Sequence, residues 1–380
     1  IDLKNILVKY QDAVSAIDTK FDIKNLTATV DEIDLNLELV KLKEIKLVES
    51  DSYVILNKVA KAKKENNETS SPIKWVVSAE KITIDKTNFL FKDNNEARMK
   101  GFDYFNIGIK DIAGSLNSLY YASDSISGSL KNLTAKDHSG FYLKKLQGDF
   151  IYTNTGAIIE DLLAETPTTT IRDFIKISYP SLAAVSEDPA VLTVDANISK
   201  SNIDMRDILF FAPFLDQMDV MKPLLKTKFF IDGKVMGKLN DLHIRSFNLK
   251  TLTNTAIIAN ADIKGLPNVA NLLINLDLKK LVTGKQDLDR LIDKSMLPEG
   301  MDIQYPNAIS LVGTFKGGFT GFDTNLSLVT EKGNATVKGF LNMAKNDTTY
   351  DATVAIDNFN IGHLLKQDSI LGLISAEAQV

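Results

Sequence analysis

The sequence predicts an all-β protein built mainly from antiparallel strands. Three observations indicate this class: apolar and polar residues alternate through most of the chain, short turn signals separate the alternating segments, and only two stretches have helical periodicity. A period of two places successive side chains on opposite faces of a strand, so each strand has one apolar and one polar face. Parallel sheets that are buried on both faces would show unbroken apolar runs instead.

The alternating segments give the expected strands in chain order. Their apolar positions are Ile33, Leu35, Leu37 and Leu39; Leu192, Val194, Ala196 and Ile198; Ile257, Ala259, Ala261 and Ile263; Leu272, Ile274, Leu276 and Leu278; Leu326 and Leu328; and the even-numbered residues from Tyr350 to Ile356. Turn signals such as KDNNE at 92–96, KDHSG at 136–140 and TEKGN at 330–334 lie between strands and suit hairpins. The tetrapeptide FNIG occurs at 105–108 and again at 359–362. We interpret each copy as a junction where one strand ends and the next begins.

Two segments are expected to be short helices. One covers 204–225, where Asp204 or Asp207 serves as the N-cap. The other covers 286–296 and ends ahead of Pro298. About twenty strands therefore share two helices, which cannot cover so many apolar strand faces. The cover must be another sheet, a closed barrel or something that is not protein.

The chain is expected to form one continuous architecture with three segments. Residues 1–72 make a β-rich segment that ends in a mobile polar loop at 58–72, and residues 73–200 and 201–380 are two further β-segments. A second loop is expected at 181–190. Residue 1 is not methionine, no signal peptide opens the chain, and the last residues read as an interrupted strand. We therefore interpret the chain as a fragment of a larger protein.

Composition excludes several classes of function. The chain has 380 residues, 44 Lys and Arg against 49 Asp and Glu, and no cysteine. The resulting net charge of −5, without a basic patch, argues against nucleic acid as a partner. The absence of cysteine removes disulfides, thiolate catalysis and cysteine-bound metals. No apolar run reaches the ~20 residues of a membrane-spanning helix.

Motifs for catalysis and cofactor binding are also absent from the sequence. His138, His243 and His363 are isolated from one another, and GKVMGKLND at 233–241 has Leu239 where a phosphate loop needs Ser or Thr. No nucleophile elbow or HExxH pair occurs. We therefore expect no enzyme, no catalytic residue, no metal site and no cofactor.

A family resemblance rests on an ordered set of segments in 73–380. In order these are FLFKD, KGFDYFNIGIKDIAGSL, SGFYLKKLQGDFIYT, LLAETPTTTIRD, DMRDILFFAPFL, GKVMGKLNDLHIRSFNLKT, ADIKGLPNV, MDIQYPNAISLVGTFKGGFTGF and YDATVAIDNFNIGHLLKQDSILG. Together they resemble the TamB/AsmA-like envelope proteins, specifically the TamB branch of the Bacteroidetes. TamB is the inner-membrane component of the translocation and assembly module, and the family is similar to the bridge-like lipid-transfer proteins.

The resemblance implies a long antiparallel sheet curled into an open, taco-like hydrophobic groove. The groove would hold phospholipid acyl chains and carry them through the periplasm in outer-membrane biogenesis. Implied partners are a TamA-like outer-membrane barrel and the inner membrane, reached through an anchor that this fragment lacks. The FNIG copies would mark where an edge of the groove turns back. The implied groove lining is Ile33, Leu35, Leu37, Leu39, Leu192, Val194, Ile198, Phe229, Ile231, Val235, Ile257, Ile263, Leu272, Ile274, Leu276, Leu278, Ile309, Leu311, Phe315, Leu326, Leu328, Val354 and Ile356.

Two other interpretations fit the alternation. The chain could be a stack of β-sandwiches in a surface structural protein, with apolar faces packed dryly together. It could also be a periplasmic chaperone or scaffold that offers a sheet edge to outer-membrane proteins during their assembly.

Overall fold

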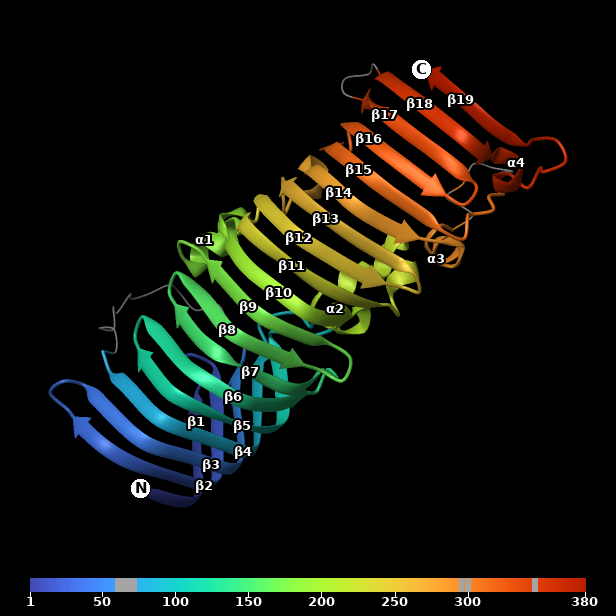
Figure 1. Cartoon of the computed structure of the whole chain (residues 1–380). Coiled ribbons are helices and arrows are strands. Elements are labelled where there is room, and N and C mark those ends of the chain that lie inside the picture. The colour runs from blue at the N-terminus through green and yellow to red at the C-terminus, as the bar shows by residue number, and fades with distance from the viewer. Residues whose placement is uncertain (59–73, 294–296, 298–301, 344–347) are drawn as a thin grey trace. The chain divides into compact units, whose positions relative to one another are not determined.

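The computed structural model describes residues 1–58, 74–293, 297, 302–343 and 348–380. Within these residues, 19 strands form one sheet, accompanied by four short α-helices (Figure 1). The predicted all-β class is therefore confirmed. The chain divides into two compact units: unit 1 comprises Ile1–Lys176 and Arg206–Leu215, and unit 2 comprises Ile177–Met205 and Asp216–Val380. The expected segments 1–72, 73–200 and 201–380 stay predictions, as does the open groove.

The strands β1 to β8 lie in unit 1, and β9 begins there and ends in unit 2. They are β1 (Asp2–Asp12), β2 (Ile17–Asp34), β3 (Leu39–Leu56), β4 (Val76–Asp93), β5 (Asn106–Ala122), β6 (Ser125–Asp137), β7 (Tyr142–Thr153) and β8 (Gly156–Glu165), followed by β9 (Thr170–Ser178). Consecutive strands from β1 to β8 pair antiparallel except β3 and β4, which pair parallel along their whole length. A parallel pair needs a long connection, and the sequence offers the polar segment 58–72 for it. From residue 59 onward that expected loop lies outside the described residues.

Unit 2 is a regular antiparallel meander. Its strands are β10 (Thr193–Asp204), β11 (Lys228–Lys238), β12 (Asp241–Thr251), β13 (Thr255–Lys264), β14 (Leu273–Thr283), β15 (Ile309–Gly318), β16 (Gly321–Thr330), β17 (Gly333–Asn342), β18 (Thr349–Asn360) and β19 (Leu373–Gln379). Each strand pairs antiparallel with the next, as predicted. Short connections such as Thr330 to Gly333 make this possible.

Bulges interrupt several strands of unit 2. β10 and β12 each contain one extra residue relative to the neighbouring strand, and Lys200 and Ser246 at these points have left-handed backbones, with φ of +44° and +53°. The Lys200 N–H donates to Asp232 Oδ1 (2.6 Å), and the Ser246 N–H donates to Asn260 Oδ1 (2.9 Å). A polar side chain on the next strand thus satisfies the backbone group that the ladder leaves unpaired. Bulges of this kind bend a strand and increase its twist.

The helical segments are shorter than expected. In place of one helix over 204–225 the chain forms α2 (Met205–Phe211) and the 3₁₀ turns η2 (Pro213–Gln217) and η3 (Asp219–Leu224). Proline has no N–H and clashes with the preceding turn, so Pro213 and Pro223 prevent a continuous α-helix. The second expected helix appears as α3 (Lys285–Leu291), while residues 294–296 of that prediction lie outside the described residues.

The expected loop at 181–190 was wrong. This segment forms α1 (Leu182–Glu187) and begins η1 (Pro189–Val191). The Ser181 hydroxyl oxygen accepts a hydrogen bond from the Ala184 N–H (3.1 Å) and caps α1. Ser at the N-cap satisfies one of the free N–H groups of the first turn. Two further helical pieces, η4 (Val269–Asn271) and α4 (Ile361–Leu364), were not anticipated either.

A buried carboxylate fixes α3 to the β12–β13 hairpin. Asp287 is 2 % exposed and accepts hydrogen bonds from the Thr253 N–H (3.1 Å), the Asn254 N–H (2.8 Å) and the Thr255 hydroxyl (2.7 Å). Burial opposes ionisation of Asp287, but these hydrogen bonds outweigh it and hold its pKa below the ordinary value of 3.8. The ionised Asp287 side chain therefore links α3 to the turn between β12 and β13 through hydrogen bonds.

The two FNIG copies occupy different structural positions. Asn106 of the first copy begins β5, and its amide lies 2.9 Å from the His138 ring. Asn360 of the second copy ends β18 and caps α4, where its Oδ1 accepts from the His363 N–H (2.9 Å). The interpretation of both copies as strand-to-strand junctions was therefore wrong, because the first opens a strand and the second joins a strand to a helix.

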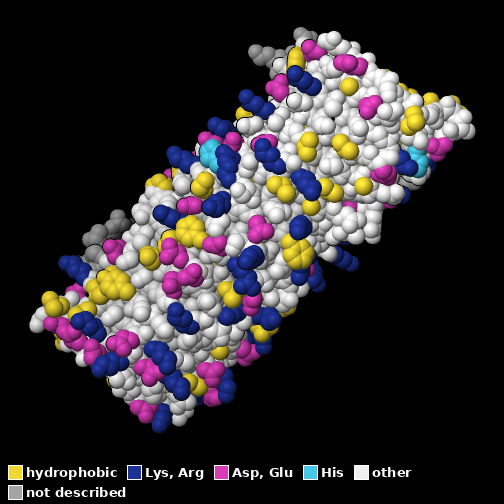
Figure 2. Space-filling view, in the orientation of Figure 1, with side chains coloured by type: hydrophobic (Ala, Val, Ile, Leu, Met, Phe, Trp, Pro, Cys, Tyr) yellow, Lys and Arg dark blue, Asp and Glu magenta, His cyan; other side chains and the backbone are white. Residues whose placement is uncertain are grey.

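Much of the molecular surface stays uncovered. The chain exposes 23405 Å², whereas a globular protein of 42.0 kDa exposes roughly 15,000 Å². The face drawn in Figure 2 shows basic and acidic side chains mixed with single hydrophobic ones. Few large apolar side chains in the described part of the chain are buried, and Leu278, at 6 % exposed, is one of them. Within the described residues all strands belong to one sheet, and no second sheet is present to pack against it.

Candidate apolar binding site

The register of unit 2 gathers the predicted groove residues on one face. Residues directly opposite each other in an antiparallel pair point to the same side of the sheet. Leu276 stands opposite Ala261 on β13 and Phe315 on β15, and the same argument extends from β10 to β18. The predicted residues that share this face are Val194, Ile198, Phe229, Ile231, Val235, Ile257, Ile263, Ile274, Leu276, Leu278, Ile309, Leu311, Phe315, Leu326, Leu328, Val354 and Ile356. We call this side the apolar face.

The apolar face contains a hollow of about 450 Å³ between β12 and β16. It is lined by six predicted residues, Ile257, Leu276, Leu278, Leu311, Phe315 and Leu326, and by Ile244, Phe247, Ala259, Ala261, Leu281 and Asn260. Ala259 and Leu278 are buried, while the other lining residues are half-buried. The size falls within the range of small-ligand pockets, and the lining offers contacts to aliphatic groups with little hydrogen bonding.

Burial follows the two faces of the sheet. In β17 the residues alternate strictly between half-buried on the apolar face and exposed on the other. Apolar side chains on neighbouring strands shield one another, but no further layer of strands completes their burial within the described residues. Apolar surface of this kind gains free energy when it is removed from water, at about 25 cal/mol per Å². The apolar face is thus suited to an apolar occupant.

Six predicted residues lie elsewhere. Asp34 Oδ1 accepts hydrogen bonds from the Asn36 N–H (2.8 Å) and the Leu37 N–H (3.0 Å), so the chain turns at 35–38 where a strand through 33–39 was expected. Ile33, Leu35 and Leu37 are exposed at this hairpin of unit 1, and Leu39 begins β3. Leu192 and Leu272 follow the 3₁₀ turns η1 and η4 as C-cap residues and precede their strands.

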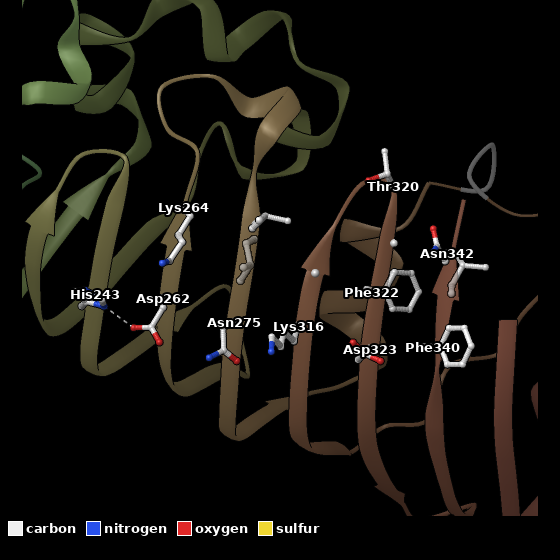
Figure 3. Close-up of a pocket in the computed structure, with 15 residues that line it drawn as sticks. His243, Asp262, Lys264, Asn275, Lys316, Thr320, Phe322, Asp323, Phe340 and Asn342 are labelled. Carbon is white, nitrogen blue, oxygen red and sulfur yellow. Dashed lines mark hydrogen bonds and ion pairs between the residues drawn. The ribbon is translucent and has the colours of Figure 1, made fainter. Parts of the chain in front are cut away.

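The residues next in sequence to those of the apolar face point to the opposite side of the sheet, where they form a polar row. In register order this row is His243, Asp262, Asn275, Lys316, Asp323 and Phe340, which come from six successive strands (Figure 3). Together with Ile274, Phe322 and Leu341, which the register places on the apolar face, they line a second hollow of about 690 Å³. We call this side of unit 2 the polar face.

Ion pairs connect neighbouring strands on the polar face. The His243 Nδ1 lies 2.7 Å from Asp262 Oδ1, and Arg245 Nη2 donates to the same oxygen at 2.5 Å. These hydrogen bonds, that of His243 first, lower the pKa of Asp262 below 3.8. Lys264 Nζ lies 3.4 Å from Asp241 Oδ2. The cluster joins β12 to β13, which is a structural role. Among the described residues, no group of three or more His, Asp or Glu side chains is placed to hold a metal ion.

Sequence reasoning missed part of the lining. Ile244, Phe247 and Leu281 belong to the apolar hollow but break strict alternation, because Ile244 and Phe247 are three residues apart and so are Leu278 and Leu281. In each case the register shifts between the two residues at a bulge. A spacing of three between apolar residues in an alternating segment is therefore the signal that would have found them.

Comparison with known proteins does not assign the chain to a family. No protein-family model, curated protein or solved structure matched the chain. The resemblance to TamB/AsmA-like proteins therefore stays a prediction from sequence. No helix in the described part of the chain is both long and apolar enough to cross a bilayer.

Proposed function

We propose that this chain binds phospholipid acyl chains along the apolar face of unit 2 and serves as a hydrophobic conduit between membranes. The observation that carries the proposal is the series of apolar residues that the register places on one face of every strand from β10 to β18, with a hollow at its centre. The resemblance to TamB/AsmA-like proteins supports placing the conduit in the periplasm, between an inner-membrane anchor and a TamA-like barrel.

The energetics favour an acyl occupant. Moving a chain of ~16 carbons through water costs on the order of 12 kcal/mol, at about 0.8 kcal/mol per CH₂. A strip of aliphatic side chains removes much of that cost without holding any one carbon in place. Such a surface suits movement along the strip better than tight binding at one point.

The dimensions are also adequate. The nine strands from β10 to β18 span eight spacings of about 4.8 Å, or roughly 38 Å. One leaflet contributes about half of a hydrocarbon core of ~30 Å. The strip is therefore longer than one acyl chain, and a lipid has several equivalent positions along it.

Analysis of co-purifying lipid tests this proposal. The chain is purified from bacterial membranes without detergent exchange, extracted with organic solvent, and the extract is examined by mass spectrometry. We expect phospholipid in the extract, and much less from a Leu276→Asp variant, because its carboxylate lies in the apolar hollow. An extract free of lipid from well-folded protein, also after incubation with lipid vesicles, would contradict the proposal.

A further inference from the structure

The two edges of unit 2 at which its strands end differ in charge. Alternate connections of an antiparallel meander lie at the same edge of the sheet. From β11 to β17 one edge has the connections 239–240, 265–272 and 319–320, and none of their residues is charged. We call these three connections, together with Met343 directly after β17, the neutral rim.

The opposite edge is rich in charge. Between β12 and β17 it has the connections 252–254, 284–308 and 331–332. Their described residues include Lys285, Asp289, Arg290, Glu331 and Lys332. Two edges of one sheet therefore present different chemistry to whatever approaches the apolar face.

Hydrogen bonds hold the neutral rim together. The Gly265 N–H donates to the Asn240 carbonyl oxygen (3.1 Å), which joins the first connection to the second. The Met343 N–H donates to the Thr320 carbonyl oxygen (2.8 Å), which joins the turn after β15 to the end of β17. Figure 3 shows Thr320 at this edge. The neutral rim is thus a formed part of the fold.

Large apolar side chains on the neutral rim face solvent. Phe319 is 68 % exposed, and Val269 and Met343 are exposed as well. At the opposite edge, none of the large apolar side chains described in the three connections is exposed. Exposed apolar side chains that gather on one side of a protein commonly mark a binding surface.

Apolar side chains continue from the neutral rim to the hollow of the apolar face. Phe322 follows the turn at the rim and lies on the apolar face, where its ring stacks on Phe315 with centroids 5.2 Å apart. Phe315 lines the apolar hollow. Ile274 and Leu341 extend the apolar face to the same edge on β14 and β17. The rim and the hollow are therefore connected by apolar surface.

We infer that phospholipid enters the apolar face from a bilayer across the neutral rim. This entry route rests on the proposed function and adds the edge at which lipid reaches the same site. Charged side chains are costly in hydrocarbon, and an acyl chain that crosses the neutral rim meets none. Protein–protein interfaces usually include charged groups such as Arg. The neutral rim has none, so a bilayer fits it better than a protein partner.

Loading kinetics test the inference. A residue on the entry route changes the barrier to loading but not the free energy of the loaded state, so it alters the rate and not the final amount. Delipidated protein is mixed with phosphatidylcholine vesicles that contain a fluorescent phospholipid, and transfer is followed over time. Val269→Ser combined with Phe319→Ser should slow loading about tenfold, through loss of apolar contact with the bilayer. Its Tm should be unchanged, because both side chains are exposed.

A residue at the opposite edge supplies the matched control. Ile370 is 78 % exposed and lies in the connection between β18 and β19. Ile370→Ser should load at the wild-type rate. An equal slowing by Ile370→Ser would show that exposed apolar side chains act at either edge, which would overturn the inference.

A tryptophan reporter locates the contact with the bilayer. The chain has one Trp, so Trp75→Phe combined with Phe319→Trp places a single reporter on the neutral rim. We expect its emission to shift to the blue with phosphatidylcholine vesicles and to be quenched by brominated acyl chains. The same reporter at Ile370 should not respond. An unshifted reporter at 319 would overturn the inference.

The rate and the final amount of loaded lipid separate the entry route from the conduit. If wild-type protein loads lipid and the Val269→Ser, Phe319→Ser variant loads it equally fast, the entry route is wrong and the conduit stands. If wild-type protein loads no lipid, the conduit is wrong and the entry route falls with it. Sedimentation that shows two copies of the chain joined through the neutral rim would also overturn the inference.

Discussion

The two faces of unit 2 share one backbone but differ in the side chains that they carry. Leu276 and Asp277 are neighbours in β14, yet Leu276 lies in an apolar hollow while Asp277 lies on the other side, with its carboxylate 2.6 Å from Lys279 Nζ. The ladder of backbone hydrogen bonds is common to both faces. The difference teaches that the ladder sets the frame, and that the alternation of residue types decides which face can accept an apolar molecule.

The faces also differ in what their side chains contribute to stability. Exposed ion pairs such as Lys279 with Asp277 contribute little, typically 0–1 kcal/mol each. The half-buried aliphatic side chains of the apolar face contribute through area removed from water, but they retain exposed area that a ligand could cover. Substitutions that weaken the contacts holding the strands and helices together should therefore lower the stability of unit 2. Substitutions on the apolar face should mainly change lipid loading.

The largest effect is a loss of thermal stability, and it is expected on substitution of Asp287. Asp287→Ala removes the acceptor for two backbone N–H groups and a hydroxyl, and should cost about 3 kcal/mol, or roughly 6–12 °C in Tm. A thermal melt followed by circular dichroism measures this. Lipid loading of the folded fraction should stay unchanged. Loss of loading without loss of stability would show that Asp287 contributes to binding directly.

The next effect separates the two faces. Leu276→Asp should reduce lipid loading about tenfold, equivalent to roughly 1.4 kcal/mol, because one charge interrupts the aliphatic strip. The variant should fold with a modest loss of Tm, since its carboxylate reaches water along an uncovered face. The matched Asp277→Leu variant should load lipid normally. A Leu276→Asp chain that does not fold would indicate a dry core in place of an open face.

A smaller effect is expected at the bulge of β12, where the Ser246 N–H donates to Asn260 on β13. Asn260→Leu removes the acceptor of the Ser246 N–H and should cost about 1 kcal/mol in urea unfolding, because that N–H remains close to water. Asn325→Leu, on the same face of β16, serves as the control and should cost less. Equal losses for the two variants would show that the side-chain contact at the bulge adds no stability.

The smallest effect is expected for the dependence of folding stability on pH. The pKa values of Asp262 and Asp287 both lie below 3.8 in the folded chain. A carboxyl group with a lowered pKa adds stability that is fully present above its unfolded pKa and is lost as the pH falls through the folded value. Stability should therefore change little from these groups between pH 7 and 5 and fall below about pH 4. Asp262→Asn should reduce the loss of stability at acid pH, measured by thermal melts between about pH 7 and 3. The same loss in this variant would show that Asp262 does not contribute to it.

Much of the fold of unit 2 could be predicted because alternation reports directly on strands and their faces. Every predicted lining residue inside a strand of unit 2 lies on one face, since the register preserves the period of two. Alternation failed at 33–39, where the Asp34 side chain stabilises a turn within an apparently regular pattern. Local hydrogen bonding of this kind leaves apolar periodicity intact, so periodicity could not detect it.

Other features depend on long-range partners and could not be predicted. The parallel pairing of β3 with β4 follows from which strands meet, and no local pattern encodes it. The hydrogen bonds of Asp287 join residues more than thirty positions apart in the sequence. The three-residue spacings at bulges were visible in the sequence, but their meaning becomes clear only once Ser246 is seen to bond Asn260 on the next strand.

Site-specific lipid crosslinking tests the central claim most directly. A photoreactive phenylalanine analogue is placed at Leu326 on the apolar face or at Asn325 on the opposite face of β16, and the chain is irradiated in cells. We predict phospholipid adducts, detected by mass spectrometry of the purified chain, at position 326 and almost none at position 325. Equal labelling at both positions, or none at 326 while the protein is folded, would contradict the assignment of the apolar face as a lipid-binding surface.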